Sequence, residues 1–188
     1  LGDPFTGLKL LRFPEVITEW MRTGATTGPI VVDFDLTNRC PHNCPRCPGE
    51  WRSDPDAQWK FEDFGRVIGE FAHLGTKAVS FGGGGAPLAH PRCIEMFEYA
   101  RHLKLSVGVI TNGAILKPGW AERLMKVADW VRVSLDAATP ETFAKIHGVP
   151  ENHFGTVLDN IKALAGVKDE STLGVGFLTG PTTKQEIV

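Results

Sequence analysis

The sequence contains no apolar run close to the roughly 18 residues that a membrane-spanning helix needs, and no N-terminal pattern typical of a signal peptide. It also carries little net charge, because 20 Lys and Arg residues nearly balance 22 Asp and Glu residues. A basic surface for nucleic acid or for a membrane is therefore not indicated. A phosphate loop of the Walker A type is also absent.

Cysteine is scarce but clustered. Three of the four cysteines lie between positions 40 and 47, with the spacing CxxxCxxC. Such close neighbours do not resemble a disulfide framework, so the spacing indicates a metal or cluster in a reducing, cytoplasmic compartment. Three thiolates on one loop can bind three irons of a cubane iron–sulfur cluster and leave the fourth iron free to bind another molecule. The three candidate ligands are Cys40, Cys44 and Cys47.

From residue 30 onward, short β-rich runs alternate with amphipathic helical patterns. Strands that alternate with helices favour a parallel sheet with right-handed crossovers, and 188 residues fit one such domain. We therefore predict an N-terminal extension with a short helix over 1–29 and a core domain over 30–188. The predicted strands are 30–36, 78–81, 105–111, 130–135 and 173–178.

The helical patterns differ in how clearly their ends are marked. Pro14 and Gly24 are typical first and terminating residues, so they bound a helix within the extension. Thr139, followed by Pro140 and Glu141, predicts the cap and first turn of another helix. Further helices are predicted around 61–71, 91–103, 120–127 and 154–164, and an incomplete one over 182–188.

Two of the predicted strands have one polar face. Arg132, Ser134 and Asp136 alternate with apolar residues, and so do Asp33 and Asp35. A parallel strand covered on both sides should be apolar on both faces. The pattern therefore favours an open or incomplete barrel around a wet cavity, with its polar groups at the carboxyl ends of the strands. Either aspartate is expected to pair with Arg132 or to contact a substrate.

Four features follow four successive predicted strands: the cysteine loop, Gly82–Pro87, Thr111–Gly113 and Ser134–Asp136. Their order resembles the radical S-adenosylmethionine (radical SAM) superfamily. Members carry CxxxCxxC after the first strand, a GGEP-like segment after the second, often a TNG-like turn after the third and a polar residue on the fourth. The resemblance covers roughly residues 30–180. It implies an α/β fold, a partial (β/α) barrel with five strands here and a sixth expected beyond Val188.

The resemblance implies an enzyme in which Cys40, Cys44 and Cys47 bind a [4Fe-4S] cluster that is part of the catalytic machinery. The unique iron would chelate S-adenosylmethionine (SAM), and reductive cleavage would give a 5′-deoxyadenosyl radical that abstracts hydrogen from a substrate. In such enzymes the cofactors carry the chemistry, whereas the protein positions and shields them. An electron donor such as flavodoxin or ferredoxin is implied as a partner.

The resemblance also implies where SAM binds. Glycines after the second strand would let backbone carbonyls approach its amino group, although the family's acidic residue is replaced here by Ala86. Ser134 and Asp136 match positions near the ribose or carboxylate. Arg46 stands where the family usually has an aromatic residue against adenine, and arginine can stack on a purine. The implied SAM-binding residues are Gly83, Gly84, Gly85, Ala86, Asn112, Ser134, Asp136 and Arg46.

The substrate stays open between several classes. The Thr-Asn-Gly turn and the Ser-Leu-Asp run look most like the branch that modifies peptides or proteins. A small-molecule enzyme and a glycyl-radical activating enzyme are the alternatives within the family. Only Cys93 is left over, so an auxiliary cluster cannot be built within this chain.

Zinc is the alternative metal for the cysteine loop. A structural zinc site needs four ligands, so His42 or Cys93 would have to join the three cysteines. The chain would then be a zinc-stabilised binding module without turnover. Cys93 lies on an apolar helical face, which is typical of a small buried hydrophobe, and His42 could instead hydrogen-bond to cluster sulfur. Four further histidines are expected to be ordinary surface or helix-end residues: His90, His102, His147 and His153.

Overall fold

Parallel strands form one sheet in the order β1-β2-β3-β4-β5, so each strand pairs with its neighbours in the sequence. The sheet is five-stranded and does not close, which confirms the predicted partial barrel. The strands are β1 (Val31–Phe34), β2 (Ala78–Phe81), β3 (Ser106–Thr111), β4 (Trp130–Ser134) and β5 (Thr172–Gly176). The computed structural model describes residues 11, 13–25, 28–47, 49, 54–167, 170–181 and 183–186.

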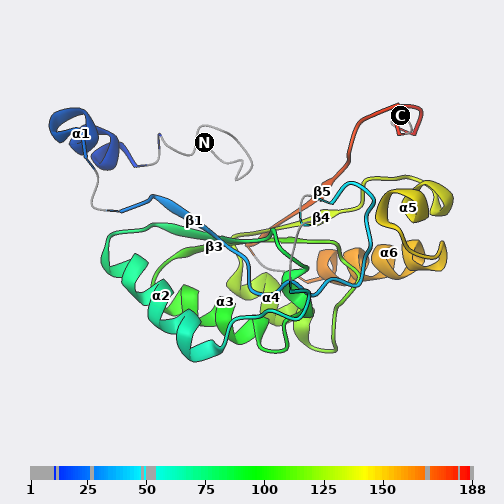
Figure 1. The fold of residues 1–188 in the computed structure, drawn as a ribbon, viewed down its shortest axis with the longest axis horizontal. Helices are drawn as coiled ribbons and strands as arrows, with labels where there is room; N and C mark the ends of the chain where they lie inside the picture. Colours follow the sequence, from blue (N-terminus) through cyan, green and yellow to red (C-terminus); the bar gives the residue numbers. More distant parts are fainter. Residues whose placement is uncertain are drawn as a thin grey trace.

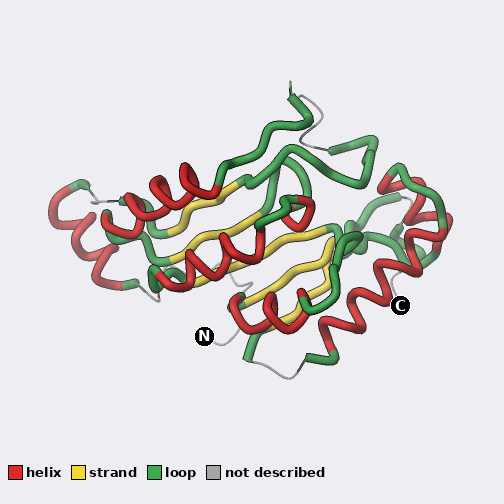
Figure 2. Tube along the Cα trace, turned by 90° about the horizontal axis from the view of Figure 1, so that it is seen from below, coloured by secondary structure: helices red, strands yellow, loops and turns green. Residues whose placement is uncertain are grey.

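Helices cover one face of the sheet and leave the other face open (Figure 1). Figure 2, seen from below, shows helices lying over the strands on the covered side and running roughly along them. The covering helices are α2 (Phe61–His73), α3 (Cys93–His102), α4 (Trp120–Val127) and α6 (Asn152–Ala165). The others are α1 (Pro14–Thr23), η2 (Pro87–Ala89) and α5 (Pro140–His147). In the described part of the chain, every helix is too short or too polar to cross a membrane.

The core fills the space between the sheet and these helices. Alternate residues of β3 and β4 point into it, and Val107, Val109, Val131 and Val133 are fully buried. Phenylalanines add most of the volume; the rings of Phe81 and Phe97, for example, are 4.6 Å apart between centroids. Each buried side chain of this size contributes about 1.5–3 kcal/mol. This packing holds the strands in place, and the strands in turn position the residues at their carboxyl ends.

The predicted ends of two helices are confirmed. Helix α1 starts at Pro14, and Gly24 follows it in the left-handed conformation, donating its N–H to the carbonyl of Trp20 over 2.7 Å. Helix α5 starts at Pro140, and the Thr139 hydroxyl accepts the Thr142 N–H over 3.3 Å. These caps satisfy backbone groups that have no partner within the helix.

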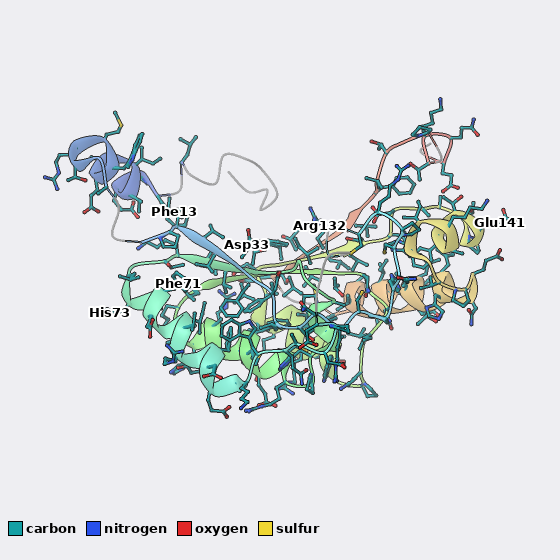
Figure 3. All side chains as sticks on the ribbon, in the orientation of Figure 1. Phe13, Asp33, Phe71, His73, Arg132 and Glu141 are labelled. Atoms are coloured by element: carbon teal, nitrogen blue, oxygen red, sulfur yellow. The ribbon has the colours of Figure 1, made fainter. Side chains whose placement is uncertain are left out.

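The open face of the sheet carries the charges that the strand pattern predicted. Figure 3 shows Asp33 and Arg132 projecting from this face. The described residues contain no ion pair between Arg132 and either Asp33 or Asp35, so the alternative of ion pairing is wrong. The reason is the strand order: β2 and β3 separate β1 from β4, and three strand spacings of about 4.8 Å keep the charges apart.

The helix predicted over 182–188 is not formed by residues 183–186, which make turns. Local side-chain bonds explain the difference, because they compete with a helix. The hydroxyl of Thr183 donates to the carbonyl of Leu178. The carboxylate of Glu186 accepts hydrogen bonds from the N–H of Ala138 and the hydroxyl of Thr142. These bonds hold the segment beside α5. Residues 182, 187 and 188 lie outside the described residues.

Candidate active site

The ends of four neighbouring strands meet around one cavity of about 310 Å³. The cysteine loop, the glycine segment after β2, and the residues that follow β3 and β4 all contribute to its wall. The structure therefore brings together every residue that the sequence nominated for cluster or SAM binding. These residues are Cys40, Cys44, Arg46, Cys47, Gly83, Gly84, Gly85, Ala86, Asn112, Ser134 and Asp136.

Backbone hydrogen bonds hold the cysteine loop from two sides. On one side, Gly85 and Ala86 donate their N–H groups to the carbonyls of Thr37 and Arg39 over 2.7 and 2.9 Å. On the other side, Asn43 donates to the carbonyl of His147 at the end of α5 over 3.0 Å. The loop is thus fixed relative to both the second and the fourth strand.

Glycine is required where these segments meet. A Cβ atom added to Gly85 would lie 2.1 Å from the carbonyl oxygen of Arg39. Gly83 has a φ of +75°, and a Cβ there would lie 2.2 Å from a carboxylate oxygen of Asp35. A side chain at Gly85 would displace the backbone of the cysteine loop, and one at Gly83 would strain the left-handed backbone and displace the Asp35 carboxylate. The glycine segment therefore exposes its backbone to the cavity at close range.

Two of the three cysteine sulfurs already accept hydrogen bonds. The side-chain amide of Asn112 donates to Cys40 Sγ, and the backbone N–H of Gly49 donates to Cys47 Sγ. Each donor–acceptor distance is 3.4 Å. All three thiols are free and partly exposed. The pKa of Cys44 is raised to about 11 by burial and by the neighbouring sulfurs of Cys40 and Cys47. Three thiolates this close repel one another unless a cation binds between them.

The acidic end of β4 also lines the cavity. Ser134 and Asp136 are half-buried, and Asp136 adopts a left-handed backbone with a φ of 59°. Burial raises the pKa of this carboxyl above its ordinary value, against the attraction of His147. Ala86, which is only 4% exposed, and the exposed Arg46 line the same cavity.

A sequence profile described as the radical SAM superfamily matches residues 34–187. The chain belongs to the radical SAM superfamily. It is 32% identical over 127 residues to the AdoMet-dependent heme synthase of Methanosarcina barkeri. This alignment covers 66% of this chain and 36% of the synthase. It is 30% identical over 123 residues to the PqqA peptide cyclase of Granulibacter bethesdensis, covering 64% of this chain and 33% of the cyclase. The chain thus spans about a third of the length of these relatives.

Solved structures support the same fold. Streptococcus suis SuiB bound to its precursor peptide SuiA superposes with a TM-score of 0.71 at 15% identity, over 98% of this chain and 41% of SuiB. SuiB bound to S-adenosylmethionine gives a TM-score of 0.67 at 14% identity, over 95% of this chain and 41% of SuiB. Radical SAM membership implies S-adenosylmethionine and an iron–sulfur cluster as cofactors.

The residues of this radical SAM domain fit such a cluster. Three free thiols face one cavity, donors already point at two of the sulfurs, and mutual repulsion of the thiolates would be relieved by bound iron. Cys40, Cys44 and Cys47 would hold it. Cys93, the alternative fourth ligand, is fully buried in the hydrophobic core on α3, where burial raises its thiol pKa to about 12.

His147 is the residue that the sequence interpretation missed. It was expected to be an ordinary surface or helix-end residue, and it does end α5, yet it is only 3% exposed and lines the cavity. Its Nε2 lies 3.1 Å from the carbonyl oxygen of Leu135, and its Nδ1 lies 3.6 Å from Cys44 Sγ. Burial lowers its pKa. The sequence offered only an indirect signal: two helices follow β4, separated at Gly148, and the first of them ends at His147.

The other histidines agree only in part with the positions and contacts that the sequence predicted. His42 contacts the ring of His147, with the two Nδ1 atoms 3.3 Å apart, and makes no hydrogen bond to sulfur. Burial, then repulsion from His147 and His153, lowers its pKa to about 4. His90 directly follows η2, so it is a helix-end residue, but it is buried and its Nε2 lies 2.9 Å from the carbonyl oxygen of Trp59, so the surface alternative is wrong. His102 is exposed at the end of α3, as expected.

Proposed function

We propose that this chain is the core of an enzyme that uses a [4Fe-4S] cluster on Cys40, Cys44 and Cys47 to cleave SAM reductively. The resulting 5′-deoxyadenosyl radical would abstract a hydrogen atom from a substrate. The observation that carries the proposal is the shared cavity, because the free thiols, the glycine segment and the end of β4 face one space. When bound, the cluster supplies the electron for cleavage and SAM supplies the radical.

The chain's own residues would bind and orient SAM. Backbone carbonyls of Gly84 and Gly85 would accept hydrogen bonds from the methionine ammonium, and Ser134 and Asp136 from the ribose. The planar guanidinium of Arg46 would stack on the adenine. The presence of all these groups in the lining of one cavity supports this assignment.

Apolar side chains would keep water away from the reacting centre. Ile110, Ile146 and Leu178 line the same cavity. Excluding water strengthens polar interactions inside and protects a reactive intermediate from side reactions. We also propose that residues 30–188 form the radical SAM core and that 1–29 are a separate extension, since α1 buries none of its residues.

We propose a peptide or protein as the substrate. Several relatives are named PqqA peptide cyclase, and SuiB has been solved with a precursor peptide. The uncovered face of the sheet supports this proposal, because Asp33 and Arg132 project from it and offer opposite charges to an incoming chain. A small-molecule substrate is the second candidate, favoured by the similarity to a heme synthase. The free thiols support a reducing, cytoplasmic location with flavodoxin or ferredoxin as electron donor.

The proposed chemistry is tested anaerobically. The purified chain is reconstituted with iron and sulfide, reduced with dithionite and mixed with SAM, and 5′-deoxyadenosine is measured by mass spectrometry. We expect it to form, and to be lost when Cys40, Cys44 and Cys47 are each replaced by Ala. Retained cleavage in the Cys44→Ala variant would contradict the cluster assignment. Peptide and small-metabolite fractions, added separately, then show which substrate class stimulates turnover.

A further inference from the structure

A second group of metal-ligand atoms lies in the same cavity wall. One ring nitrogen of His42, the Sγ of Cys44 and one ring nitrogen of His147 all lie within 4.8 Å of one another. Only the cysteine belongs to the proposed cluster site. The two histidines come from different parts of the chain, the cysteine loop and the end of α5, so the fold brings them together.

Two of the three spacings match the edges of a tetrahedral zinc site, and the third, between His42 and Cys44, is within 4.8 Å. Zinc binds imidazole nitrogen at about 2.0–2.1 Å and thiolate sulfur at about 2.3 Å, which places two nitrogens about 3.3 Å apart and a nitrogen and a sulfur about 3.6 Å apart. The two Nδ1 atoms are 3.3 Å apart, and Cys44 Sγ is 3.6 Å from His147 Nδ1. Little movement is therefore needed for one ion to contact all three.

The surroundings of His147 prepare it as a ligand. Its Nε2 can donate a proton only to the carbonyl of Leu135, 3.1 Å away, and that bond leaves a lone pair on Nδ1. A carboxylate oxygen of Asp136 also lies 4.0 Å from Nε2. Histidines bound to metals typically donate their other ring N–H to a carbonyl or carboxylate in this way.

His42 can carry its ring proton on Nε2, as His147 does, without losing a hydrogen bond at that nitrogen. It is 7% exposed, and its Nε2 has no hydrogen-bond partner among the described residues. Moving the ring proton to Nε2 frees Nδ1 for a metal and breaks only the contact between the two histidines. That contact is replaced by two bonds to the ion.

We propose that His42, Cys44 and His147 form a mononuclear Zn²⁺ site that is occupied when no iron–sulfur cluster is present. Nitrogen and thiolate donors suit zinc. Binding releases the Cys44 thiol proton to solvent, and the fourth position faces the cavity, where water can fill it. Zinc and cluster exclude each other because both need the Cys44 thiolate. The chain would thus have a second metal state, beyond the proposed radical chemistry.

The proposal is tested by titrating the metal-free, anaerobic chain with Zn²⁺ against a chromophoric chelator. We expect one zinc per chain, retained when Cys40 and Cys47 are both replaced by Ser. His42→Gln and His147→Gln should each weaken binding by more than the roughly 10–100-fold that loss of an outer partner costs, and Cys44→Ser should do the same. His153→Gln is the matched control, because its ring lies 6.3 Å from that of His42 and outside the ligand set.

In the wild-type chain, the spectrum of bound Co²⁺ reports the ligand set without any variant. The wild-type chain should show tetrahedral cobalt bands with charge transfer from a single thiolate, unchanged in the Cys40→Ser/Cys47→Ser variant. Charge transfer from three thiolates, or zinc that survives His147→Gln and is lost with Cys40 and Cys47, would overturn the proposal in favour of a three-cysteine site. Absence of zinc binding would overturn it outright.

A third measurement separates this proposal from the proposed function. Zinc added before iron and sulfide should block formation of the iron–sulfur chromophore, and a chelator should restore it. If the zinc-free chain never forms the chromophore, the cluster assignment fails while the zinc titration stands. If zinc and the full chromophore coexist, the shared use of Cys44 is refuted.

Discussion

The side-chain amide of Asn112 donates a hydrogen bond to the sulfur of Cys40 over 3.4 Å, and so joins the end of β3 to the cysteine loop. Hydrogen bonds to thiolate sulfur reduce its negative charge, and they are among the features that set the potential of an iron–sulfur cluster. A residue from the third strand thereby acts on a ligand that follows the first. The relationship gives Asn112 a role toward the proposed cluster in addition to its place in the SAM cavity.

Replacing Asn112 with Leu should therefore lower the reduction potential of the reconstituted cluster. Loss of such an outer hydrogen bond typically costs about 10–100-fold in metal affinity or activity. The potential is measured by redox titration followed by electron paramagnetic resonance. Ser106→Ala, at the exposed start of the same strand, is the control. An unchanged potential in Asn112→Leu would show that this bond does not persist beside the cluster.

Gly148 lies against the cysteine loop, and its replacement should disturb the loop. Its φ is +61°, and a Cβ atom added there would lie 2.0 Å from the carbonyl oxygen of Asn43. Gly148→Ala should lose about 1–2 kcal/mol for the left-handed backbone, and a further amount because the loop must move. Cluster content per chain should fall as well. Both are measured, by urea denaturation of the metal-free chain and by iron analysis after reconstitution.

Gly24→Ala is the matched control for this change. Gly24 also follows a helix in the left-handed conformation, with a φ of +72°, but nothing lies within 4 Å of an added Cβ. It should show the backbone cost alone and keep its full iron content. Equal effects of the two variants would mean that the contact between Gly148 and Asn43 does not hold the loop.

The sequence predicted those parts of the site that depend on short spacings. The CxxxCxxC spacing, the glycine segment and the alternation around Ser134 are local patterns, and the parallel strand order follows from alternating strands and helices. His147 was missed because its contact with Cys44 joins residues 103 positions apart, which no local pattern indicates. The turn at 183–186 was missed because the partners of Glu186 lie 44 to 48 positions away.

Acid should destabilise the metal-free chain through His42. Burial lowers the pKa of its ring from 6.5 to about 4 in the folded state. Between these values the unfolded chain takes up a proton that the folded chain does not, so stability is lost as the pH falls through this window. From pH 7 to pH 5, His42 alone should account for about 2 kcal/mol of the loss.

Urea denaturation at pH 7, 6 and 5 measures this dependence. The variant His42→Leu should lose less stability between pH 7 and pH 5 than the wild type does, whatever its stability at pH 7. His102→Leu, at the exposed end of α3, should keep the wild-type dependence. If His42→Leu and the wild type lose equal stability over this range, the neutral, buried state of His42 is refuted.

Ala86 offers a gain-of-function test of the SAM site. The family usually has an acidic residue here, and Ala86 lines the cavity beside the glycine carbonyls while being only 4% exposed. Ala86→Glu should place a carboxylate near the proposed position of the methionine ammonium. A hydrogen bond to a charged group contributes about 1.5–3 kcal/mol, so SAM should bind the cluster-loaded chain about 10–100-fold more tightly.

Isothermal titration with SAM measures this gain, and Ala86→Gln separates charge from size. The glutamine has nearly the same volume but forms only a neutral bond, worth about 0.5–1.5 kcal/mol, so it should bind SAM more weakly than the glutamate variant. A salt-dependent advantage of Glu over Gln would support an ammonium group beside position 86. If both variants bind SAM equally, or more weakly than the wild type, the glycine carbonyls already satisfy the ammonium or it binds elsewhere in the cavity.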